Sequence, residues 1–161
     1  MRRLTLIGTA IAVALAFGAP ARAENSTAFY RILLAKKEAS IEDAIQALAR
    51  LKGFDGVPGV EKSLAYLYER KVAFRGNIVD VKNRSLTKGN AAHLILTAVN
   101  HRGGAMYRLF PSNQRFAVRE AVFMEWMADD SEPDDVMSGG DLISFLSRVV
   151  GDRSRGAGGE E

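Results

Sequence analysis

Apolar residues recur every three or four positions over most of the chain, which is the spacing of one face of a helix. The pattern predicts five clear helices, at residues 40–53, 60–70, 87–103, 112–127 and 138–151. Residues 29–35 fit either a short helix or a strand, and residues 105–111 form an apolar connector. We therefore predict a mainly α fold, in which the loosely alternating segment 72–81 leaves room for one minor β element.

Three of the predicted helices begin with a residue that favours a helix N-terminus: Ser40, Thr87 and Ser138. Each is followed by Asp or Asn at the third helical position and by apolar residues at the fourth, fifth, seventh, eighth and eleventh positions. The starts lie 47 and 51 residues apart, and the last two helices each follow another amphipathic helix. We predict a compact array of helix-loop-helix repeats. The alternative is that capped amphipathic helices share these generic features without being repeats.

The two ends of the chain differ from the middle. Residues 1–23 combine two arginines, an apolar stretch and a small-residue cleavage site at 21–23, which together are typical of a secretory signal peptide. The apolar stretch is shorter than the roughly 20 residues of a membrane-spanning helix, so a membrane anchor is the less favoured alternative. We expect a single helical domain at 24–151, a disordered Gly-rich tail at 152–161, and a periplasmic or extracellular location in the cell envelope.

Composition changes this picture in two ways. The absence of cysteine excludes disulfides, thiolate metal sites and lipidation at cysteine. The net charge of +3 comes from three arginines of the predicted leader, so the rest of the chain is balanced. Basic residues nevertheless gather at 70–119, whereas residues 120–141 are acidic. A local positive surface can bind an anionic polymer, although these basic residues also fit a solvated face or pairing with the acidic residues 129–135.

Sequence motifs favour a noncatalytic protein without cofactor or metal. His93 falls on the polar side of its helix, and His101 lies two turns away, too far for both to bind one zinc ion. Neither Gly-x-Ser-x-Gly nor His-Glu-x-x-His occurs. The acidic residues 129–135 lack the glycine and distal glutamate of a calcium-binding EF-hand. An envelope hydrolase would have to use Glu120 and Glu125, the one plausible carboxylate pair on a helix.

Residues 64–72 followed by 86–92, and more faintly 121–127 followed by 136–141, resemble S-layer homology repeats, in which the second helix opens with a Thr-Arg-Ala-Glu-type signature. The resemblance covers most of residues 40–150. It implies binding of anionic cell-wall polysaccharide or peptidoglycan, with the signature base and acid near the sugar.

The signature is only partly kept. Thr87 and Lys88 keep its hydroxyl and base, while Asn90 replaces the acid. The third helix keeps the hydroxyl and acid at Ser138 and Asp141 but has a glycine in place of the base, and Ser40 is followed by an isoleucine.

These observations predict a noncatalytic exported envelope protein that binds or organises cell-wall material. The candidate ligand-binding residues are Thr87 and Lys88 of the signature, with Arg84 and Arg70 of the basic segment. The alternative is a protein–protein interaction or assembly module of the envelope without a glycan site. Nucleic acid is disfavoured as a partner, because the expected export and the overall charge balance both count against it.

Overall fold

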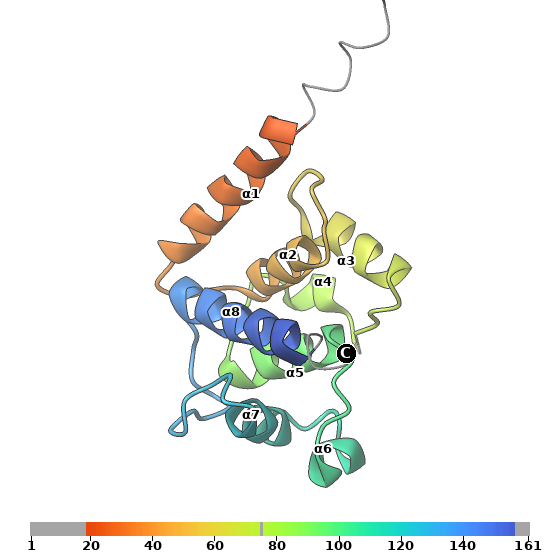
Figure 1. The fold of residues 1–161 in the computed structure, drawn as a ribbon, viewed down its shortest axis with the longest axis vertical. Helices are drawn as coiled ribbons and strands as arrows, with labels where there is room; N and C mark the ends of the chain where they lie inside the picture. Colours follow the sequence, from red (N-terminus) through yellow and green to blue (C-terminus); the bar gives the residue numbers. More distant parts are fainter. Residues whose placement is uncertain (1–18, 75, 157–161) are drawn as a thin grey trace, which may run out of the picture.

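A computed structural model describes residues 19–74 and 76–156. These residues form eight helices and no β-strand, so the described chain is mainly α (Figure 1). The helices are α1 (Ala19–Leu34), α2 (Ile41–Leu51), α3 (Val60–Glu69), α4 (Ile78–Val81), α5 (Lys88–Ala98), α6 (Ala105–Leu109), α7 (Gln114–Phe123) and α8 (Gly139–Gly156).

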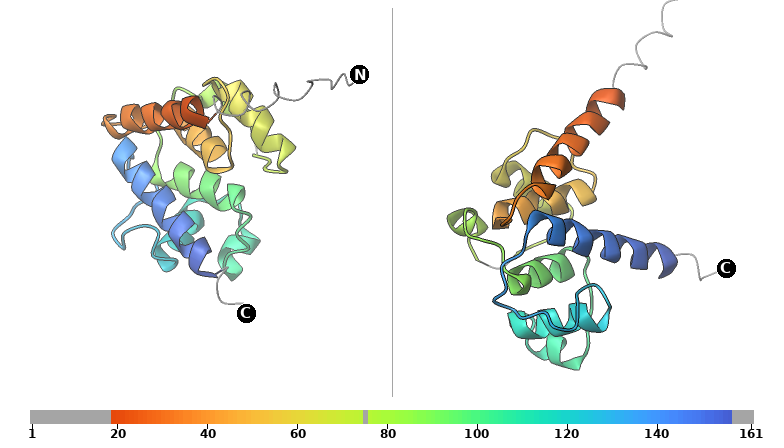
Figure 2. Two further views of the ribbon diagram at one scale, coloured as in Figure 1. Left: turned by 45° about the horizontal axis from the view of Figure 1, so that its top comes forward. Right: turned by 90° about the vertical axis from the view of Figure 1, so that its left-hand side faces the viewer.

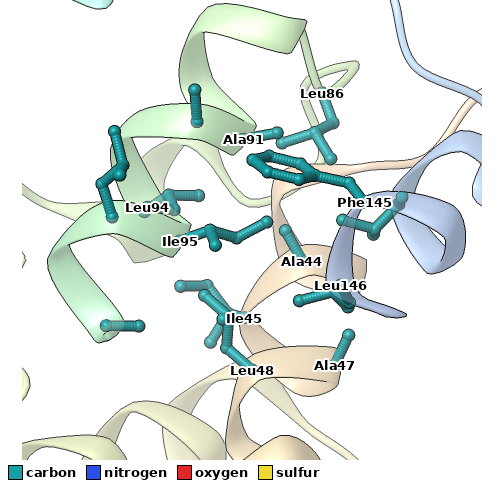
Figure 3. Packing of buried hydrophobic residues seen from close by; sticks show 14 of the residues in the cluster. Ala44, Ile45, Ala47, Leu48, Leu86, Ala91, Leu94, Ile95, Phe145 and Leu146 are labelled. Carbon is teal, nitrogen blue, oxygen red and sulfur yellow. The ribbon is translucent and has the colours of Figure 1, made fainter. Parts of the chain in front are cut away.

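The core lies between α2, α5 and α8, the three helices that begin at the predicted caps. Helix α2 also packs against α3, α5 against α7, and α1 against α8. Figure 2 shows α8 beside α2 and α5, with α6 and α7 at the end of the molecule away from α1. The apolar stripes of α2, α5 and α8 meet in one cluster, in which Phe145 and Leu146 of α8 point toward side chains of α5 and α2 (Figure 3).

All three predicted caps are made. The Ser40 hydroxyl accepts the Asp43 N–H at 3.2 Å, the Thr87 hydroxyl accepts the Asn90 N–H at 3.2 Å, and the Ser138 hydroxyl accepts the Asp141 N–H at 3.1 Å. At Ser40 and Ser138 the aspartate also accepts the cap's own N–H, completing a capping box.

The residues just before the three caps are joined in a closed ring of backbone hydrogen bonds. The Leu86 N–H donates to the Ala39 carbonyl at 2.7 Å, Met137 donates to Leu86 at 2.8 Å, and Ala39 donates to Met137 at 2.8 Å. All three side chains are buried. The ring brings the starts of α2, α5 and α8 together and gives the three caps corresponding surroundings.

Two helices end earlier than predicted, because a residue other than glycine closes each of them. Helix α5 ends at Ala98 and α7 at Phe123, each several residues early. Asn100 and Glu125 take left-handed φ angles of 53° and 59°. The following N–H groups bond back to the Leu96 and Ala121 carbonyls, which closes each helix in the manner usually supplied by glycine. The predicted connector 105–111 contains the short helix α6.

The prediction of a minor β element at 72–81 is wrong. Residues 78–81 form α4, whose three apolar side chains are partly buried against the core. A strand here would need a partner, and the extended pairing in the described chain is limited to two isolated bridges, Ser40 with Ser85 and Thr87 with Val136.

The structure describes the two ends of the chain only in part. Residues 1–18 of the predicted signal peptide lie outside the described residues, and the helical backbone of α1 begins before the expected cleavage site. Helix α8 continues past Gly151 to Gly156, so residues 152–156 of the expected disordered tail are helical; residues 157–161 lie outside the described part. Among the residues described, no helix has both the length and the apolar character needed to cross a bilayer.

Candidate functional site

The structure separates Arg70 from the other three predicted ligand-binding residues, which lie at or just before the start of α5. Thr87 uses its hydroxyl as the α5 cap. Arg70 lies at the end of α3, where its guanidinium stacks on the Tyr66 ring at 3.5 Å, whereas Lys88 opens α5 on the other side of the molecule (Figure 1). Arg84 is exposed in the segment before α5. Of the four, Lys88 lines the pocket described below.

The acidic loop (residues 129–135) packs against the start of α5. Backbone N–H groups of Lys88 and Gly89 donate to the Asp135 and Pro133 carbonyls, both at 2.8 Å. The Lys88 ammonium also lies 2.8 Å from the Asp135 carboxylate, and this hydrogen bond holds the pKa of Asp135 below its ordinary value. Lys88 is thus already paired with the acidic loop, which is one of the alternatives that the sequence left open for the basic residues.

Lys88 borders a small pocket of about 160 Å³, here called the Lys88 pocket, which also receives residues from the end of α7 and from α8. Its polar lining consists of Lys88, Ser131, Asp141, Ser144, Arg148 and the edge of Trp126. The Arg148 guanidinium donates to the Glu125 carbonyl at 3.3 Å. The lining thus carries cations, a carboxylate, hydroxyls and an aromatic edge, the groups that hydrogen-bond small polyhydroxy ligands.

Trp126 is the unusual member of this lining. Its side chain is held edge-on to the His101 ring, with ring centroids 5.6 Å apart, and the residue is only 4% exposed. Its buried indole N–H has no hydrogen-bond partner within the described part of the chain. A buried indole usually finds such a partner, so this N–H is an unsatisfied donor in a residue that lines the Lys88 pocket.

A larger and more apolar pocket of about 710 Å³ lies between α6 and α7 and is here called the α6–α7 pocket. Phe123 and Met106 line it and remain 81% and 50% exposed. At its edge, the Glu120 carboxylate contacts His101 Nε2 at 2.9 Å and accepts the Gly104 N–H at 3.0 Å. Glu120 therefore ties the turn at 101–104 to α7.

The two glutamates of the alternative hydrolase hypothesis do not share a pocket. Glu120 lines the α6–α7 pocket, whereas Glu125 has a left-handed backbone and lines a different pocket with Arg148. The described residues contain no cluster of three or more histidine, aspartate or glutamate side chains placed to hold a metal ion. Comparisons with protein-family models, curated proteins and solved structures find no match to this chain.

Sequence reasoning found Lys88 but missed Trp126 and Arg148 as its neighbours. Their sequence distance from Lys88 hides the contact, because it depends on how the acidic loop and α8 return to the start of α5. One feature of the sequence does mark Trp126. It is the single tryptophan of the chain and lies at the end of the apolar helix pattern of residues 112–127.

Proposed function

We propose that this protein is a noncatalytic, exported component of the cell envelope that binds or organises cell-wall material. The Lys88 pocket is its sugar-binding site. The observation that carries the proposal is the lining of this pocket, in which Lys88 and Arg148 lie with Trp126, a residue whose buried indole N–H lacks a partner among the described residues.

The arrangement of the caps supports the interpretation of α2, α5 and α8 as S-layer-homology-like repeat units. Each helix starts with a hydroxyl cap, and the residue before each cap takes part in the same closed ring. Corresponding backbone bonds also follow two of the caps, since Ile41 donates to Arg84 and Lys88 donates to Asp135. Unrelated capped helices would have no reason to share these contacts.

The pocket's size and charges narrow the ligand class. A volume of about 160 Å³ is below the usual range for larger ligands and suits a single sugar ring. An acidic substituent on that ring would be favoured by Lys88 and Arg148, but it has to compete with Asp135 for Lys88. Binding of an acidic wall sugar is therefore expected to weaken as salt is added.

A sedimentation assay with purified peptidoglycan tests the proposal. Wild-type protein is expected to sediment with the wall at low salt, and Lys88→Glu is expected to remain in the supernatant. Arg84→Glu makes the same charge change at an exposed basic residue three positions before Thr87 and serves as the matched control. Failure of the wild type to sediment at low salt, or equal loss in both variants, contradicts the Lys88 site.

Trp126 supplies an independent measurement. Because the chain has one tryptophan, its indole N–H gives one nuclear magnetic resonance signal. Addition of N-acetylmuramic acid, an acidic wall sugar, should shift this signal in the wild type and shift it less in Lys88→Glu. A signal that does not move at saturating sugar would place any wall binding elsewhere.

The α6–α7 pocket favours a second candidate function, an envelope protein–protein interaction module. Exposed apolar side chains gathered at one pocket are typical of a protein interface. Phe123→Ser is expected to abolish co-purification of a partner from envelope extracts. Tyr68→Ser, which removes an exposed aromatic side chain from α3, should leave such a partner bound.

A further inference from the structure

Arg50, near the end of α2, is buried, and two of its three guanidinium nitrogens have no hydrogen-bond partner in the described chain. The residue is 9% exposed, and within the described chain neither Nε nor Nη1 of its guanidinium has a hydrogen-bond partner. The guanidinium makes a cation–π contact with the Phe29 ring of α1, whose centroid lies 4.4 Å from the guanidinium carbon. Burial lowers the pKa of Arg50 below its ordinary value, but an arginine remains protonated in proteins, so the positive charge is retained.

The other charges on this side of α2 do not neutralise Arg50. Asp43 lies on the same helix, and both of its carboxylate oxygens contact the Lys36 ammonium, at 2.7 and 2.8 Å. Asp43 also accepts the Ser40 N–H and hydroxyl. Asp55 is exposed and has an interaction of its own. Of the charged side chains that the described residues bury, Asp43 is therefore paired and Arg50 is not.

Arg50 lines a cavity of about 640 Å³, here called the Arg50 cavity, whose lining residues come from α1, α2 and the turn that follows α2. Much of the remaining wall is apolar and includes Phe29, Ile32, Leu33 and Val57, while Asp43, Gln46 and Asp55 supply its polar groups. Ile32 and Val57 remain 64% and 65% exposed. The cavity therefore combines a guanidinium that has no ion-pair partner in the described chain with a mostly apolar wall, in which one carboxylate, that of Asp43, is already paired with Lys36. Its volume is in the usual range for small-molecule sites.

We propose that the Arg50 cavity binds a carboxylate carried on an apolar body, with the guanidinium holding the carboxylate and the Phe29, Ile32 and Val57 side chains covering the apolar part. A guanidinium matches a carboxylate in charge and in planar geometry, and the resulting hydrogen bonds are among the strongest in proteins. Two sources carry this chemistry, a peptide C-terminus ending in an apolar residue and a fatty acid. The inference does not depend on the Lys88 pocket, which shares none of these residues.

Titration calorimetry on the purified protein tests the proposal with acid and amide pairs. N-acetyl-leucine and its amide represent the peptide terminus, while octanoate and octanamide represent the fatty acid. The better acid is expected to bind about tenfold more tightly than its amide, because only the acid pairs with Arg50. Which acid binds better identifies the source. Equal binding of acid and amide, or no saturable binding of either acid, overturns the proposal.

Arg50→Met keeps most of the side-chain volume and removes the charge. It is expected to abolish the preference for acid over amide, whereas Arg84→Met, the same change at an exposed arginine, should leave the preference intact. A preference that survives in Arg50→Met overturns the assignment.

A rim variant keeps the test decisive if Arg50→Met fails to fold. Val57→Glu at the exposed rim introduces a tethered carboxylate that competes for Arg50, so the acid should bind several-fold more weakly than to Val57→Gln. Equal acid affinity in these two variants also counts against the site.

Discussion

Lys88 and Arg50 are both cations on core helices, and the fold treats them in opposite ways. Lys88 lies at the start of α5 in the most basic part of the sequence, yet its ammonium is 2.8 Å from Asp135 of the acidic loop. Arg50 lies in α2 outside that basic segment, is buried, and has no ion-pair partner among the described residues. Charge density along a sequence thus does not reveal where the folded protein keeps an uncompensated charge.

The largest effect on stability is expected at Gly139, the glycine that lets the start of α8 pack closely against Leu33 of α1. A Cβ at Gly139 would overlap the Leu33 carbonyl, and Leu33 lines the Arg50 cavity. Gly139→Ala should therefore lower the free energy of unfolding by about 3 kcal/mol, since backbone must move. Gly151→Ala, in the same helix with open space around the new methyl group, should raise it by about 0.5–1 kcal/mol. Urea unfolding measures both, and equal signs would contradict the close packing of α8 on α1.

Removing each cation in turn tests the comparison directly. Arg50→Met should raise the free energy of unfolding by roughly 1 kcal/mol, because it removes a buried charge that lacks a counter-ion in the described chain. Lys88→Met should lower it by about 0.5 kcal/mol, because it breaks a partly exposed ion pair. Chemical denaturation of the two variants provides the measurement. Destabilisation by Arg50→Met would mean that the charge of Arg50 is already compensated in the protein without bound ligand.

Acid titration separates the two cations further. The Lys88 hydrogen bond, followed by one from the Glu132 N–H, lowers the pKa of Asp135 in the folded protein. A lowered folded-state pKa means that the stabilisation is complete above the unfolded-state pKa and is lost as the pH falls through the folded-state pKa. The melting temperature of the wild type should therefore fall more steeply than that of Lys88→Met between about pH 5 and pH 2. Arg50→Met should keep the wild-type slope, since no carboxylate pairs with Arg50 in the described residues.

Local rules explain what the sequence predicted correctly. Hydroxyl caps and apolar spacing depend on neighbouring residues, and they located α2, α5 and α8 together with most of the apolar side chains that these helices turn to the core. Helix α2 also buries Asp43, Gln46 and Arg50, which the apolar spacing does not mark. The early ends of α5 and α7 were missed because Asn100 and Glu125 take a left-handed conformation that glycine usually provides.

The candidate sites were harder to predict, because they depend on contacts between distant segments. The acidic loop meets Lys88, Trp126 reaches the same pocket from the turn after α7, and Arg50 faces Phe29 of α1. Periodicity marks Arg50 only as a polar position near the end of an amphipathic helix, so nothing in the pattern indicates that its charge is buried.

The smallest expected effect concerns Tyr30 of α1. Burial raises the pKa of its hydroxyl, while the positive charge of Arg50 partly opposes this by favouring the tyrosinate. Arg50→Met removes the opposing charge, so the pKa of Tyr30 should rise further, whereas Lys88→Met should leave it unchanged. Spectrophotometric titration resolves the group when each protein is compared with its own Tyr30→Phe derivative. A pKa of Tyr30 that is the same with and without Arg50 would mean that the guanidinium charge is already neutralised, and the contrast between Arg50 and Lys88 would then disappear.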